Sequence, residues 1–383
     1  MYFKELVTGK DIARFVERYS NNIKEIATTL DENPIQVVKI SEGRKPSIFL
    51  KAGNHSSEIA GIHALLTLLV EGLDTPFETY MIPCGNPFDF GGYQYALSYM
   101  CEKKIYINSD AECLSILTDV GQNIYDGDGF SLFQVGEIIF AYIEQEKLDS
   151  RILFYGKLNE LSLKDPHLRS ALLGRRIFFP NKIYYKEDYG PYEKAGLSAW
   201  TSKDGYVSNL NRLYDRYDIP PELYSIREFC ERLKPAMVID LHESCINTRI
   251  PRKLKESDNQ IGHYFLILPP EHISSIPGIE KQVAETMIAE TEKAGFKCLT
   301  RDQLEVSWGY PDTDYFKGYV RKDVIDAMPF YRWATRFADV SITSETVMDM
   351  PIEKRIDIHT TLVRAALDAF RNLIDESTLK SQL

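Results

Sequence analysis

Short apolar runs alternate with longer helical patterns along most of this 383-residue chain. Strand-like runs occur at residues 36–40, 47–52, 79–83, 236–241, 264–268 and 339–343, and helical spacing occurs at residues 11–31, 59–69, 220–233, 279–294 and 356–374. Such alternation is typical of a sheet with helices packed on its faces. The pattern therefore predicts an α/β fold.

Residues 101–205 break this alternation. They contain two helix-like runs, at 134–145 and 165–173, separated by loops rich in Asp, Gly and Tyr. We expect this segment to be an elaboration inserted at about 101–205 into one domain that spans residues 1–383. The chain has no internal repeat and no low-complexity segment that would indicate another organisation.

The overall charge excludes some classes of partner. A formal net charge of −11 argues against nucleic acid or an anionic membrane surface as the main partner. No stretch approaches the roughly 18 apolar residues of a membrane span. The first residues lack the basic and apolar regions of a signal peptide, and the six cysteines form no CxxC pair. We expect a cytoplasmic protein with reduced thiols, of undetermined oligomeric state.

Two histidines stand directly after predicted strands. His55 follows the run at 47–52, with Glu58 three residues later, and His242 ends the run at 236–241. In open α/β sheets, functional residues collect at the carboxyl ends of strands. A lone histidine in such a place is commonly structural, but two imidazoles and a carboxylate together make a ligand set for a hydrolytic zinc ion. The sequence thus predicts a zinc site.

Further short motifs occur in a fixed order between residues 47 and 346. After His55-Ser56-Ser57-Glu58 come Asn86-Pro87, Asn209-Leu210-Asn211-Arg212, Asp240-Leu241-His242 and Thr343-Ser344-Glu345-Thr346. In this set and order the chain resembles the zinc carboxypeptidase superfamily, which contains the M14-type metallopeptidases and the related deacylases of the succinylglutamate desuccinylase and aspartoacylase type.

The resemblance implies a fold and a role for each matching residue. The fold would be a three-layer single domain with a mixed, mostly parallel eight-stranded sheet. His55, Glu58 and His242 would be the ligands of a zinc ion. Glu345 would be the catalytic general base, while Asn211 and Arg212 would bind the free carboxylate of the substrate. A guanidinium suits that task because its planar fork binds a carboxylate through two hydrogen bonds.

Some family positions are changed or left open here. Asn209 stands where the family often has an acidic residue that holds a zinc-bound imidazole, and an amide oxygen accepts that N–H less strongly. Several roles have competing candidates: Arg175 or Arg176 for the arginine that polarises the carbonyl, and Tyr315, Tyr319 or Tyr331 for the mobile tyrosine. For some residues the sequence does not decide between a role near the site and a structural or solvated position, namely Asp240, Glu243, His63, His359, Arg332 and Arg336.

The function predicted from these motifs is a zinc-dependent carboxypeptidase-like hydrolase that cleaves a C-terminal amide bond of a peptide. The alternative is an N-acyl amino-acid deacylase, and a third hypothesis is an inert metal- or peptide-binding pseudoenzyme. The deacylase relatives usually carry a β-rich domain after the catalytic Glu, whereas the chain after Glu345 reads mainly as one helix. This difference favours the peptidase.

Overall fold

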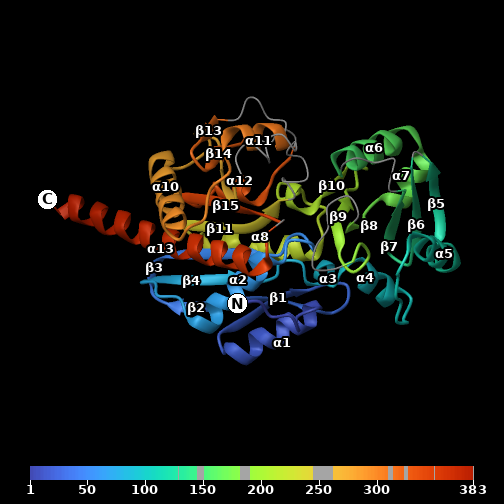
Figure 1. Cartoon of the computed structure of the whole chain (residues 1–383), viewed down its shortest axis with the longest axis horizontal. Helices are drawn as coiled ribbons and strands as arrows, with labels where there is room; N and C mark the ends of the chain where they lie inside the picture. Colours follow the sequence, from blue (N-terminus) through green and yellow to red (C-terminus); the bar gives the residue numbers. More distant parts are fainter. Residues whose placement is uncertain are drawn as a thin grey trace.

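The computed structural model describes residues 1–127, 129–144, 151–181, 190–244, 262–308, 314–322, 327–348 and 350–382 (Figure 1). Its helices are α1 (Gly9–Tyr19), α2 (Ala60–Glu71), α3 (Pro87–Phe90), α4 (Gly92–Met100), α5 (Asp110–Val120), α6 (Arg151–Lys164), α7 (Pro166–Leu172), α8 (Pro221–Leu233), α10 (Pro277–Lys293), α11 (Arg301–Trp308), α12 (Phe330–Ala334) and α13 (Ile352–Gln382), with a 3-10 turn η2 at Leu210–Arg212. Its strands are β1 (Ile23–Thr28), β2 (Pro34–Glu42), β3 (Arg44–Ala52), β4 (Phe77–Ile82), β5 (Gln122–Gly127), β6 (Phe130–Val135), β7 (Ile138–Ile143), β8 (Arg176–Pro180), β9 (Ala195–Thr201), β10 (Val207–Asn209), β11 (Met237–Ser244), β12 (Tyr264–Leu268), β13 (Asp314–Phe316), β14 (Tyr319–Arg321) and β15 (Val340–Val347).

The larger sheet has nine strands among the described residues, in the order β1-β2-β4-β3-β11-β15-β12-β14-β13. The four central strands β4, β3, β11 and β15 run parallel to one another, and β12 is antiparallel to β15. The predicted mixed α/β class is confirmed, although the sheet has one strand more than the eight expected and its outer strands pair mainly antiparallel. All residues of β11 and β15 are buried, as expected for strands covered on both faces.

Helices cover both faces of this sheet and make three layers (Figure 1). Apolar residues of α2, α10 and α13 pack together on one face, whereas those of α8 and α12 pack on the other. The alternation along β11 follows this division, because Val238 lies in the second core and Ile239 in the first. No helix in the described part of the chain is long and apolar enough to cross a membrane.

A second sheet of six strands, in the order β10-β9-β8-β7-β6-β5, lies at the end of the molecule opposite the C-terminus of α13 (Figure 1). Most of it comes from the predicted insertion. Two hydroxyl groups of the His55 loop donate to it, from Ser56 to the Ala195 carbonyl and from Ser57 to the Gly196 carbonyl, both at 2.8 Å. These buried contacts support one domain with an insertion, which stays a prediction.

Two helical predictions are wrong. In the segment 11–31 the helix ends at Tyr19, and Ile23–Thr28 form β1, which pairs antiparallel with β2. The run at 134–145 lies across β6 and β7, joined by a turn in which Gly136 has a φ of 59°. The stretches that form strands, β1, β6 and β7, are short and rich in β-branched or aromatic residues, and periodicity alone does not separate helix from strand in such stretches. Pairing with a neighbouring strand decided the outcome.

Candidate metal centre

The first two candidate ligands lie in a tight loop between β3 and α2. Gly53 turns the chain with a φ of 72°, and a Cβ there would come within 3.0 Å of the Cys84 Cα. The loop then closes through a hydrogen bond of 3.3 Å from the Glu58 N–H to the His55 carbonyl. The helix predicted to follow begins at Ala60. Both side chains are therefore brought together by a turn ahead of the helix.

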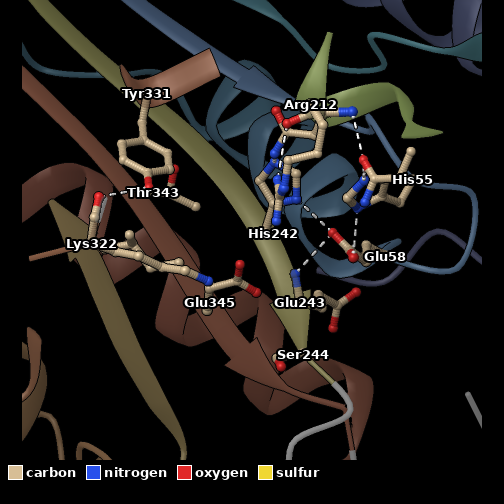
Figure 2. A pocket seen from close by; sticks show the side chains of 13 residues that line it. His55, Glu58, Arg212, His242, Glu243, Ser244, Lys322, Tyr331, Thr343 and Glu345 are labelled. Atoms are coloured by element: carbon tan, nitrogen blue, oxygen red, sulfur yellow. Dashed lines mark hydrogen bonds and ion pairs between the residues drawn. The ribbon is translucent and has the colours of Figure 1, made fainter. Parts of the chain in front are cut away.

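The third candidate ligand reaches the same place from a central strand. His242 lies on β11, next to β3 in the sheet, and its Nδ1 is 2.7 Å from the Glu58 Oε2. The Nδ1 of His55 is 2.7 Å from the other oxygen, Oε1. One potential ligand atom from each residue lies within 4.8 Å of the others, and all three residues are buried. Figure 2 shows the carboxylate between the two imidazoles.

The other nitrogen of each imidazole faces an oxygen of the protein. The Nε2 of His55 is 3.3 Å from the Asn209 Oδ1, and the Nε2 of His242 is 3.0 Å from the Asp240 Oδ2. An acceptor at Nε2 favours the tautomer with its proton on Nε2, which leaves the Nδ1 lone pair for a metal ion. The donor set and its tautomers thus fit a metal ion such as zinc.

Charges around the cluster favour its ionised form. Burial opposes the charge on Glu58, but the imidazoles of His55 and His242 hold the pKa of this carboxyl far below its ordinary value. Burial also opposes protonation of His242, yet Asp240 and Glu58 raise the pKa of this imidazole to about 10. The carboxylates of Glu58 and Asp240 therefore stabilise positive charge at the two imidazoles, whether it is carried by protons or by a metal cation.

A buried ion pair stands behind His242. Asp240 accepts a hydrogen bond of 2.8 Å from the Lys51 ammonium, and neither residue is exposed to solvent. Lys51 lies on β3 opposite Asp240 in the parallel register. Burial raises the pKa of Asp240, but His242 and Lys51 lower it more, so this carboxylate stays ionised. Asp240, which the sequence left open, is thus a contact of a candidate ligand.

Glu345 and Arg212 line the same pocket as the three candidate ligands. The pocket is lined by His55, Glu58, Asn209, Asn211, Arg212, His242, Glu243, Ser244, Ile267, Lys322, Tyr331, Thr343 and Glu345. Glu345 lies beside His242 in the parallel register of β11 and β15, so both side chains are on the face covered by α8 and α12. The half-buried Arg212 donates to the Asn211 carbonyl at 2.9 Å.

Asn211 lies between His242 and α12. Its Nδ2 is 3.4 Å from the Nε2 of His242, and its Oδ1 accepts a hydrogen bond of 3.1 Å from the Phe330 N–H. Glu243 belongs to the opposite face of β11, where Arg355 and the Ala60 N–H each donate to its carboxylate at 2.7 Å. It therefore anchors the start of α2 and is buried, not solvated.

The structure shows where the residues lie whose roles the sequence left undecided. Arg175 donates to the Gly136 carbonyl and Arg176 pairs with Asp89 and Glu222, so neither lines the pocket. Of the three tyrosines, only Tyr331 lines it. Arg332 and Arg336 do not, and His63 and His359 are core residues on α2 and α13. Lys322 lines the pocket and was missed, because no motif surrounds it in the sequence.

Comparisons with known proteins test the predicted resemblance to zinc carboxypeptidases. The family model for zinc carboxypeptidases matches residues 10–76, which include His55 and Glu58. A comparison with curated proteins gives no match. The predicted resemblance to the zinc carboxypeptidase superfamily is confirmed by the family match, which does not extend to His242, Arg212 or Glu345.

Several solved structures are similar. The metallo-carboxypeptidase from Burkholderia cenocepacia has 11% identity and a TM-score of 0.46, with 95% of this chain and 69% of that chain covered. The metallo-carboxypeptidase from Pseudomonas aeruginosa in complex with (2-guanidinoethylmercapto)succinic acid has 12% identity and a TM-score of 0.46, with 96% of this chain and 69% of that chain covered. Bovine thrombin-activatable fibrinolysis inhibitor in complex with tick carboxypeptidase inhibitor has 12% identity and a TM-score of 0.43, with 95% of this chain and 95% of that chain covered.

Proposed function

We propose that this protein is a zinc-dependent, carboxypeptidase-like hydrolase that cleaves the C-terminal amide bond of a peptide. The observation that carries the proposal is the meeting of three kinds of group in one pocket. These are the buried cluster of His55, Glu58 and His242, the carboxylate of Glu345 on the neighbouring strand, and the guanidinium of Arg212. A hydrolase of this class needs a metal site, a base and an anchor for the substrate.

His55, Glu58 and His242 would hold the zinc ion through their Nδ1 and carboxylate atoms. Three protein ligands with an open fourth position are the arrangement of catalytic rather than structural zinc sites. Zinc bound there supplies a Lewis acid and lowers the pKa of water to near 7. Asn209 and Asp240 keep the two imidazoles oriented through their Nε2 atoms.

Glu345 would act as the general base and then as the acid. It takes a proton from the attacking water, whose oxygen forms a bond with the carbonyl carbon of the substrate. When the C–N bond breaks, the same proton goes to the leaving amine. Its position beside His242, 8% exposed and in the pocket, suits a base that must be partly shielded from solvent.

Arg212 would hold the free carboxylate at the end of the substrate. Its guanidinium fork can form two parallel hydrogen bonds with a carboxylate, which fixes both the position and the orientation of the chain end. The hydrogen bond from its Nη1 to the Asn211 carbonyl restrains the guanidinium. This anchor makes the proposed enzyme an exopeptidase.

Metal analysis tests the ligand assignment. Protein purified without chelators should hold about one zinc per chain, and His55→Ala and His242→Ala should each lose it, because two ligands rarely hold zinc against a competing buffer. His272→Ala changes an exposed histidine outside the pocket and is the matched control. Full zinc occupancy in both ligand variants would contradict the assignment.

A substrate panel tests the reaction. Peptides with a free C-terminus, the same peptides with an amidated C-terminus, and N-acyl amino acids are assayed before and after chelation, with zinc added back. We expect zinc-dependent turnover of the free-acid peptides. Turnover confined to N-acyl amino acids would assign the protein to the deacylases, and absence of turnover in every class would leave a binding protein.

A further inference from the structure

Lys322 brings a second cationic group into the pocket. It follows β14, and its own N–H donates to the Leu268 carbonyl at 3.0 Å. Its carbonyl accepts a hydrogen bond of 3.2 Å from the Tyr331 hydroxyl. The residue is only 5% exposed, yet it lines the pocket together with Arg212. The pocket therefore contains an ammonium as well as a guanidinium group.

The pocket has two chemically different sides, as Figure 2 shows. The candidate metal ligands form one side, and Lys322, Thr343 and Tyr331 form the other, with Glu345 between them. Ile267 also lines the pocket and is opposite Thr343 in the antiparallel pairing of β12 and β15. Apolar and hydroxyl-bearing residues therefore line this side of the pocket together with Lys322.

We propose that Lys322 determines specificity by binding the side-chain carboxylate of a C-terminal Asp or Glu. This inference rests on the proposed function, and it names the substrate class: chains that end in a dicarboxylic amino acid. Arg212 would bind the α-carboxylate, since a planar fork suits a group of fixed orientation. Lys322 would bind the second carboxylate, because an ammonium on a flexible stem is a point charge that tolerates different chain lengths.

The ammonium can serve Glu345 and the substrate together. In Figure 2 the side chain of Lys322 extends toward Glu345. An ammonium has three N–H donors, so contact with one carboxylate leaves donors for another. A substrate with a neutral end leaves this charge without its second acceptor, and a C-terminal Lys or Arg would place a like charge against it. Both cases are expected to lower kcat/KM relative to a C-terminal Glu.

A purely supporting role for Lys322 predicts a different result. If the ammonium only positions Glu345, its removal lowers turnover of every substrate by the same factor. If it recognises the substrate, its removal lowers the preference for Glu over its neutral isostere Gln. The ratio of the two rate constants therefore separates the two roles, whatever happens to the absolute rate.

The experiment compares peptides, and the matching N-acyl amino acids, that differ only in ending in Glu, Gln or Lys. The parent should prefer Glu to Gln by about 10- to 150-fold in kcat/KM, as expected for a hydrogen bond to a charged group. Lys322→Met should bring this ratio close to one, and Lys322→Glu should favour Lys over Glu. Lys317→Met, an exposed lysine on the turn before β14, is the control and should keep the parent ratio.

Binding of the same ligands, measured by calorimetry, keeps the two proposals apart. Turnover with equal rates for Glu and Gln, or a ratio unchanged in Lys322→Met, overturns the inference and leaves the proposed function standing. Binding without turnover, with a Glu preference that Lys322→Met abolishes, supports the inference and rejects the hydrolase. Neither binding nor turnover of any ligand rejects both.

Discussion

Replacing Lys51 by Met should destabilise the protein strongly, although Lys51 is not a candidate ligand. Its ammonium is 2.8 Å from the Asp240 carboxylate and 4.6 Å from the centre of the Phe330 ring. Neither member of the pair is exposed, so water cannot replace the lost partner. The variant keeps the volume of the side chain but leaves Asp240 with His242 as its remaining charged contact.

The size of the effect follows from the burial of the pair. Removing one member of a buried ion pair typically costs about 3–5 kcal/mol, because the other charge stays buried without compensation. That cost is a large part of the roughly 5–15 kcal/mol by which a protein is stable. The double variant Lys51→Met with Asp240→Asn removes both charges, and should therefore be less destabilised than Lys51→Met alone.

Urea unfolding of the metal-free protein measures the stability, and competition with a chromophoric chelator measures zinc affinity. Loss of the partner of a metal-bound imidazole typically costs 10–100-fold in affinity, so we expect a fall of about that size in the double variant, where Asn accepts the His242 N–H less strongly than a carboxylate. Lys51→Met alone keeps the Asp240 carboxylate on His242 and should lose less zinc affinity than the double variant. Lys10→Met, at an exposed position on α1, is the control. A Lys51→Met variant as stable as this control would refute the reasoning.

Three further results are expected. Glu345→Gln should fold, keep zinc and lose hydrolysis by about 10²–10⁴-fold, because an amide cannot take the proton, and activity within about 3-fold of the parent would place the base elsewhere. Arg212→Lys should lower kcat/KM on free-acid peptides by about 10- to 150-fold with unchanged zinc content, and parent-like kinetics would reject the carboxylate anchor. His359 is buried between the hydroxyls of Ser344 and Thr346, and burial lowers its pKa from 6.5 to about 3. Below pH 6.5 the unfolded chain therefore binds a proton at this imidazole that the folded chain does not bind. The stability present above pH 6.5 is lost by about 1.4 kcal/mol per pH unit as the pH falls toward 3. The urea midpoint should therefore fall less steeply between pH 7 and 4 in His359→Gln than in the parent, and equal slopes would contradict this.

The sequence by itself determined the features that depend on residues close together in the chain. Strands β3, β11 and β12 were predicted close to their observed places because strands that are buried on both faces are continuous apolar runs. The His-x-x-Glu spacing likewise predicted that His55 and Glu58 lie together, since a single turn brings them there. The runs at 11–31 and 134–145 were misread, because partners distant in the chain decide between strand and helix where the local signal is weak.

Only the tertiary structure decided which distant residues meet. The register of β11 with β3 and β15 places Lys51 opposite Asp240 and His242 opposite Glu345, and a shift by one residue would turn each side chain to the other face. The pairing of β14 with β12 brings Lys322 into a pocket to which no motif assigns it. These contacts join residues far apart in the sequence, so they depend on packing and register and leave no local pattern to read.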